Sequence, residues 1–176
     1  IDTHITVNGF VINALYAGII SFNSGINMTV AASGFSQSGG TFTGNNGNIS
    51  INGAFNLSGG TFTSSTATLQ ITGGYTYSGG TFNHNNGTVA FSTTQTITGN
   101  TSFYNIIFLS VGGTYTIAAG TTITSINNVT VSGSSSCAIN TGIVEIKGDL
   151  TLTATQNNSV NGGTATFLFN GTGTQN

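Results

Sequence analysis

The feature that most constrains this chain is a five-residue segment, SGGTF, that recurs at a fixed interval. It occurs at residues 38–42, 58–62 and 78–82, and a looser copy, NGGTATF, lies at 161–167. A chain that returns to the same residues every twenty positions is built from repeated structural units. This period is too short for a propeller blade, and the repeat lacks the helices of a leucine-rich horseshoe.

Between the repeats, β-branched and aromatic residues alternate with polar residues. Examples are NISIN at 48–52, TLQIT at 68–72 and VEIKGDLTLT at 144–153. Alternation with a period of two is typical of strands with one buried face, and no segment has the i, i+3, i+4 spacing of an amphipathic helix. Asn- and Gly-rich segments such as GNNG at 44–47 separate these candidate strands, as tight turns require. We therefore predict an all-β protein.

Superposition of the repeats aligns apolar residues in columns, with Ser, Thr, Asn and Gln between them. The columns are Phe42/Phe62/Phe82, Ile49/Leu69/Val89, Ile51/Ile71/Phe91 and Phe35/Phe55/Tyr75. Because successive side chains of a strand point to opposite faces, the apolar columns should face inward. We predict a right-handed parallel β-solenoid with coils of about 20 residues, about eight or nine coils stacked at ~4.8 Å. The alternative is an antiparallel β-sandwich of the pilin type, which gives no reason for repeats in register.

The second part of the chain repeats the first more loosely. The segment QTITGNTSFYNII at 95–107 matches THITVNGFVINAL at 3–15. We therefore interpret residues 1–176 as a single β-solenoid domain with two diverged halves, 1–91 and 92–176.

Charge is almost absent from this chain. It has one Lys or Arg and three Asp or Glu in 176 residues, with a net charge of −2, whereas about a quarter of the residues of a soluble domain are charged. A single Lys excludes electrostatic binding to nucleic acid. No apolar run reaches the roughly 18 residues of a membrane helix, so we expect no membrane insertion. The first residue is Ile rather than Met, which suggests either a processed chain or an excised segment, and of the two we expect a mature, secreted protein.

Three charged residues lie close together and were considered as a catalytic site. Glu145, Lys147 and Asp149 are spaced at i, i+2 and i+4, which would place them on the outer face of one strand. Polysaccharide-cleaving β-helices use clustered carboxylates, often with a basic residue. Without Arg or further acids nearby, we interpret the three as an exposed ion-pair stripe of little energetic weight. A polysaccharide-cleaving enzyme is therefore the least favoured alternative.

The other chemically active side chains do not form a site in the sequence. His4 and His84 are about four coils apart, so we expect no metal ligation. Cys137 has no base among its neighbours and is expected to be a small buried residue rather than a nucleophile. We expect no catalytic residues, no metal and no cofactor.

A ladder of threonines is the one candidate binding surface. In the predicted coils Thr41 and Thr43 stack on Thr61 and Thr63, and the first column continues with Thr81. Flat outward Thr-x-Thr ladders resemble the ice-binding faces of β-solenoid antifreeze proteins. The resemblance implies an ice-binding or carbohydrate-binding module. The simpler interpretation is that Thr is a good polar strand former on a weakly charged surface.

Longer segments carry a second resemblance. TQTITGNTSFYNIIF, GTYTIAAGTTIT and VEIKGDLTLT resemble the repeats of large secreted or surface proteins of bacteria, namely β-solenoid adhesins and filamentous-haemagglutinin-like or autotransporter-passenger-like chains. The resemblance covers most of the chain and carries no catalytic signature. It implies a parallel β-helix on the cell exterior, with a role in adhesion, matrix or filament formation.

These observations predict a non-enzymatic extracellular structural protein, a subunit of a filament, sheath or adhesive fibre. Its main partner is expected to be a second copy stacked head-to-tail, with surface glycans as a further class of partner. We expect Ile5, Val7 and Val11 of one subunit to stack on the coil with Phe167 and Phe169 of the next. Such a contact does not close on itself and propagates as a fibre.

Overall fold

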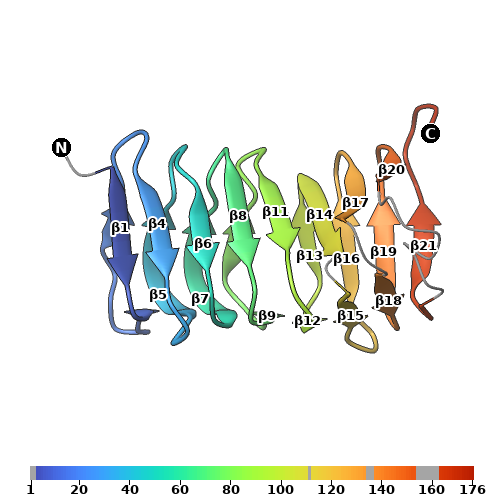
Figure 1. The fold of residues 1–176 in the computed structure, drawn as a ribbon. Helices are drawn as coiled ribbons and strands as arrows, with labels where there is room; N and C mark the ends of the chain where they lie inside the picture. The colour runs from blue at the N-terminus through green and yellow to red at the C-terminus, as the bar shows by residue number, and fades with distance from the viewer. Residues whose placement is uncertain (1–2, 111, 134–136, 154–162) are drawn as a thin grey trace.

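The molecule is an elongated rod of parallel strands whose N- and C-terminal ends lie at opposite ends of the rod (Figure 1). The computed structural model describes residues 3–110, 112–133, 137–153 and 163–176. They form an all-β solenoid of about seven turns with about 21 residues per coil, and no helix. The predicted solenoid is confirmed, and the parallel pairing is incompatible with the antiparallel sandwich.

About seven turns are present rather than the eight or nine coils expected, and the turns differ in length. The steps from Ile5 to Met28 and from Ile106 to Val129 each span 23 positions, whereas the step from Val89 to Ile106 spans 17. The turns absorb these differences, so the strands of successive coils remain in register.

Three sheets run along the rod. Sheet A has eight strands, one per coil: β1 (His4–Val7), β4 (Asn27–Val30), β6 (Ile49–Ile51), β8 (Thr68–Ile71), β11 (Thr88–Phe91), β14 (Asn105–Ser110), β17 (Val129–Gly133) and β20 (Leu150–Leu152). Sheet C has four strands: β13 (Thr101–Phe103), β16 (Thr122–Ser125), β19 (Ile143–Ile146) and β21 (Thr166–Phe169).

Sheet B has nine strands and bends around a corner of the first coils. Its strands are β2 (Phe10–Ile12), β3 (Ile19–Ser21), β5 (Phe35–Thr43), β7 (Phe55–Thr63), β9 (Tyr75–Tyr77), β10 (Thr81–Asn83), β12 (Gln95–Thr98), β15 (Thr114–Ile117) and β18 (Ala138–Asn140). The strands β3 and β10 pair with the second halves of β5 and β7. The two long strands therefore cover two faces of the rod.

The core consists of apolar columns that run along the rod axis. Two of them cross all of sheet A without a shift in register: Ile5, Met28, Ile49, Leu69, Val89, Ile106, Val129 and Leu150 form inner column 1, and Val7, Val30, Ile51, Ile71, Phe91, Phe108, Val131 and Leu152 form inner column 2. The six central residues of each column are buried. Each such side chain contributes about 1.5–3 kcal/mol of hydrophobic stabilisation.

The repeated phenylalanines form the predicted ladder on sheet B. Phe42 pairs with Phe62 and Phe62 with Phe82, and their rings stack with centroids 5.0 and 5.5 Å apart. Phe42 and Phe62 are fully buried, and Phe82 is partly buried against the core. The expectation of a single stacked ladder is confirmed.

The glycine pairs of the repeat form the corner inside β5 and β7. The second glycine of each pair, Gly40 or Gly60, has a positive φ of 55° or 71°, a conformation that favours glycine over residues with a Cβ. Gln37 supports this corner from inside, because its Nε2 donates hydrogen bonds to the carbonyl oxygens of Gly39 and Thr61 at 3.1 and 3.0 Å. The strands bend at the glycines without ending there.

The loose similarity between the two parts of the chain relates segments on different faces. Ile5 lies in β1 of sheet A, whereas Ile97, which the sequence alignment superposes on it, lies in β12 of sheet B. Likewise, Val144 lies in sheet C and its counterpart Leu69 in sheet A. The shared pattern is that of a solenoid strand, irrespective of its face.

Candidate functional site

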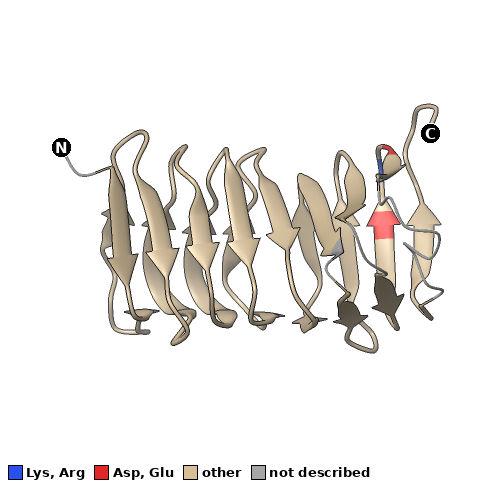
Figure 2. Ribbon diagram, in the orientation of Figure 1, with Lys and Arg blue, Asp and Glu red and all other residues tan. Residues whose placement is uncertain are grey.

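The charged residues of the described chain lie in one short stretch near the C-terminal end of the rod (Figure 2). Glu145 lies in β19 of sheet C, whereas Lys147 and Asp149 lie in the turn that leads to β20 of sheet A. The prediction that all three share the outer face of one strand is wrong, because β19 ends at Ile146 and the chain then turns a corner.

Glu145 is held as a carboxylate by two hydrogen bonds from neighbouring coils. Its oxygens accept from Asn170 Nδ2 and from Thr124 Oγ1, each at 2.8 Å. These bonds lower the pKa of the Glu145 carboxyl group, which stabilises the ionised form and disfavours a role as general acid. Within the described ranges, no group of three or more His, Cys, Asp or Glu could hold a metal ion.

The histidines and the cysteine lie in separate coils. The His4 ring lies 3.0 Å from Thr29 Oγ1. His84 accepts a hydrogen bond from the Asn86 backbone N–H at 3.0 Å and stacks on Tyr104 with ring centroids 5.6 Å apart. Cys137 is buried, and burial raises the pKa of its thiol to about 11. A thiol with this pKa is almost entirely protonated at neutral pH and is a poor nucleophile.

The predicted threonine ladder lies on the outer face of β5, β7 and β10. Thr41, Thr61 and Thr81 pair in register, as do Thr43, Thr63 and Asn83. The same columns continue toward the N-terminal end as Ile19 and Ser21. The surface is therefore two columns wide, and its fully hydroxylated part is two coils long.

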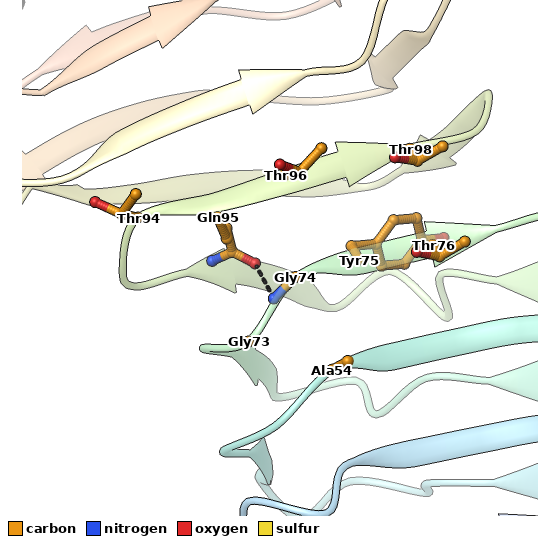
Figure 3. Close-up of a pocket in the computed structure, with 9 residues that line it drawn as sticks. All are labelled: Ala54, Gly73, Gly74, Tyr75, Thr76, Thr94, Gln95, Thr96 and Thr98. Atoms are coloured by element: carbon orange, nitrogen blue, oxygen red, sulfur yellow. Dashed lines mark hydrogen bonds between the residues drawn. The ribbon is translucent and has the colours of Figure 1, made fainter.

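A shallow groove of about 370 Å³ lies where the turns after sheet A enter sheet B (Figure 3). Gln95 crosses it: Oε1 accepts from the Gly74 N–H at 3.2 Å, and Nε2 donates to the Ile71 carbonyl at 3.0 Å. The other lining groups are mainly Thr hydroxyls and backbone, while the Tyr75 ring is buried in the core. The groove therefore has neither an acid–base pair nor an exposed aromatic ring for stacking on a sugar.

Seven of the eight large exposed apolar side chains among the described residues lie in the first and last coils, but they do not all face the ends of the rod. Val11, Ile19 and Leu168 point outward from their strands, Leu15 and Tyr16 lie between β2 and β3, and Leu152 and Phe169 are inner residues of the last coil. At the C-terminal end the core opens into a cavity of about 560 Å³ lined by Leu150, Leu152, Phe169, Gln175 and Asn176. Two inner residues of the last coil, Leu152 and Phe169, therefore remain accessible at this end.

The residues predicted at a subunit interface occupy different faces of these ends. Ile5 and Val7 are partly buried on the inner side of β1 in sheet A, whereas Phe167 and Phe169 lie on the inner side of β21 in sheet C. Val11 is 76% exposed, because it points to the outer side of sheet B between two inward residues of β2. It therefore belongs to the flank of the rod and not to its end.

The sequence reasoning missed a ladder of side-chain hydrogen bonds along the edge of sheet A. Its members precede the first inner residue of a strand, and each Oδ1 accepts from a backbone N–H one coil further on: Asn27 from Asn48 at 2.8 Å, Asn48 from Thr68 at 3.2 Å, Asn105 from Asn128 at 3.3 Å, Asn128 from Asp149 at 3.0 Å and Asp149 from Asn176 at 2.9 Å. We call this set the asparagine ladder. Its signal in the sequence is Asn recurring 21 or 23 positions apart, immediately before the first inner apolar residue of a strand.

The described residues contain no helix with the length and apolar character needed to cross a bilayer. No family model, curated protein or solved structure matches this chain. A function for it therefore rests on the geometry of the rod and its ends.

Proposed function

We propose that this chain is an extracellular structural protein, a subunit of a filament, sheath or adhesive fibre that assembles head-to-tail. The observation that carries the proposal is that two inner residues of the last coil, Leu152 and Phe169, are 57% and 48% exposed, on a rod whose sides are polar and weakly charged. Exposed apolar surface that continues a buried core is typical of an interaction site. Two different surfaces that meet head-to-tail form an open polymer rather than a closed dimer.

The strand edges at the two ends support the same proposal. Parallel sheets have a free edge at each end, and proteins normally protect such edges with charges, Pro or a covering segment. The chain contains no Pro, and the end strands β1, β20 and β21 contain no Asp, Glu, Lys or Arg. With a net charge of −2, little electrostatic repulsion opposes association.

Electron microscopy of the purified chain tests the proposal directly. A single copy is a rod roughly 40 Å long, given eight strands stacked at ~4.8 Å. We expect filaments many times longer, and a sedimentation coefficient that rises with protein concentration. Phe169→Lys, which places a charge in the open core, should abolish the filaments. The matched control Thr63→Lys places the same charge on the flank and should leave them intact. Short monodisperse rods at all concentrations would contradict the proposal.

A second candidate function is binding of ice or of surface glycans by the threonine columns. It is favoured by one observation, the pairing of Thr41 with Thr61 and of Thr43 with Thr63 on a partly exposed face. Thermal hysteresis of the purified chain, or retention on a glycan array, would support it. Thr61→Tyr should then remove the activity, because the larger side chain disrupts the flat surface. Absence of both activities in the unmodified chain would eliminate this candidate.

A further inference from the structure

We infer that the junction between two copies is an in-register continuation of the solenoid. In this junction β1 of one copy pairs with β20 of the preceding copy, and β3 pairs with β21. The inference rests on the proposed head-to-tail assembly and adds the strands, the register and the residues that meet. The occupant of each open end is therefore a second copy of this chain.

Sheet A fixes the register of the junction. Inner columns 1 and 2 pass through eight strands without a shift, so a ninth strand in the same position continues both columns. Ile5 of the incoming copy then packs on Leu150, and Val7 packs on Leu152, which is 57% exposed in the single copy. A slip by one residue would turn the apolar side chains of β1 outward. Registers shifted by an odd number of residues are therefore disfavoured.

Backbone hydrogen bonds show where the incoming strand begins. The Leu150 N–H donates to the Asn176 carbonyl at 3.0 Å, and the Asn176 N–H donates to Asp149 Oδ1 at 2.9 Å. Asn176 thus lies beyond β20 as Asp149 lies beyond β17, where the Val129 N–H donates to the Asp149 carbonyl at 2.9 Å. This is the position that His4 of the incoming copy would take. Pairing at the junction therefore starts at Ile5 of the incoming copy. Asn176 of the first copy and His4 of the incoming copy would occupy the same position, so one of these two segments must move away from it. The remaining edge of β20 then acquires a partner by addition of a strand.

Sheet C completes the junction on a second face. Phe167 packs on the core near the C-terminal end of the rod, and Phe169 pairs with the buried Ile146. Ile20 and Phe22 pack on the core near the N-terminal end. Pairing of β21 with β3 places Phe167 on Ile20 and Phe169 on Phe22, and a shift of two residues would leave one phenylalanine without a partner. The prediction from the sequence is that Ile5, Val7 and Val11 stack on the coil with Phe167 and Phe169; this arrangement adds which strand of that coil each inner residue meets.

Disulfide cross-linking tests the register of sheet A. Thr6 and Thr151 lie in the same outer column, between the two inner residues of their strands. At the junction their Cα atoms would be ~4.8 Å apart, which is within the range of a disulfide. We expect the double variant Thr6→Cys/Thr151→Cys to give a ladder of covalent dimers, trimers and larger species on a non-reducing gel after mild oxidation with oxidised glutathione.

Two control proteins isolate this contact. In Thr29→Cys/Thr151→Cys the first cysteine lies one coil further in, so the Cα atoms are ~9.6 Å apart and no ladder should form. The unmodified chain has only the buried Cys137 thiol and should also remain uncross-linked. A ladder from the Thr29 variant instead of the Thr6 variant would overturn the register.

A second pair of variants distinguishes the strand on which β21 docks. Ser21→Cys/Leu168→Cys should cross-link if β21 meets β3, whereas Thr6→Cys/Leu168→Cys should cross-link only if β21 meets β1. Filaments with the second cross-link, or with neither, would overturn the junction while leaving the filament function in place. Monomers in sedimentation and microscopy, with no cross-link in any variant, would overturn both.

Discussion

The rings of Phe42 and Phe62 stack face to face, with centroids 5.0 Å apart and planes 4° from parallel. Phe55 meets Phe62 edge-on at 4.9 Å and 82°. The edge-on arrangement is a favoured one for aromatic pairs, and both centroid distances lie in the range typical of such pairs. The face-to-face contacts run along the rod, where the strand spacing matches the ring spacing, and the edge-on contacts cross the corner between the two faces. The SGGTF repeat therefore fixes both the rise and the cross-section of the coil.

Removal of one ring should destabilise the rod strongly. Phe62→Ala deletes a fully buried side chain between two stacked neighbours and should lower the free energy of unfolding by about 3–5 kcal/mol, measured by urea denaturation. The control Phe169→Ala removes a ring that is 48% exposed and should cost clearly less. Equal losses in the two variants would contradict the assignment of Phe62 to the core.

Three glycines separate the effects of backbone conformation and of close packing. Gly60 has a φ of 71°, and a Cβ there would lie 2.3 Å from the Gly39 carbonyl oxygen. Gly120 has a φ of 75° with open space around it. Gly173 has open space around it and no positive φ. We expect Gly120→Ala to cost about 1 kcal/mol, Gly60→Ala more than that, and Gly173→Ala almost nothing. Thermal unfolding followed by circular dichroism measures this order.

The asparagine ladder should contribute to stability through its acceptor oxygens. Asn48→Ala leaves the Thr68 N–H without its acceptor and should cost about 1 kcal/mol, whereas Asn48→Asp retains an oxygen at that position and should cost less. Hydrogen exchange offers a site-specific measurement: the Thr68 amide should exchange faster in the Ala variant than in the Asp variant. Identical exchange rates would show that the oxygen is dispensable.

The Glu145 carboxylate makes stability depend on pH in the acidic range. Its pKa is lowered by hydrogen bonds from Asn170 and Thr124, so the folded state favours the ionised form. The contribution is present above the ordinary Glu pKa of about 4.3 and is lost as pH falls through the lower folded-state value. Because Glu145 is largely in contact with solvent, the effect should stay below about 1 kcal/mol. The loss of thermal stability between pH 6 and pH 2.5 should be smaller in Glu145→Gln than in the unmodified chain.

The solenoid could be predicted from the sequence because its repeats superpose core positions. The columns Phe42/Phe62/Phe82 and Ile49/Leu69/Val89 are in-register pairs in the structure, since every coil places the same side chain at the same corner. Regular alternation within each strand was sufficient to assign the inner and outer faces.

The positions of the corners, where one strand ends and the chain passes to the next face, could not be predicted from the sequence. The alternation that runs through Glu145, Lys147 and Asp149 predicts a single strand, but β19 ends at Ile146. The match between Ile5 and Ile97 failed for a similar reason, because strands on different faces share one residue pattern. In β2 all three residues are apolar, so alternation could not reveal that the side chain of Val11 points outward.

The axial direction of the hydrogen bonds has a mechanical consequence. The backbone bonds between coils run along the rod, and the chain enters at one end and leaves at the other (Figure 1). Tension applied at the two ends therefore loads one coil-to-coil interface at a time, in the manner of a zipper, rather than shearing all strands together. Each coil that detaches releases about 21 residues, or roughly 70 Å of extended chain. A fibre of such rods would lengthen in steps of one coil under load, dissipating work at each step while the remaining coils stay folded.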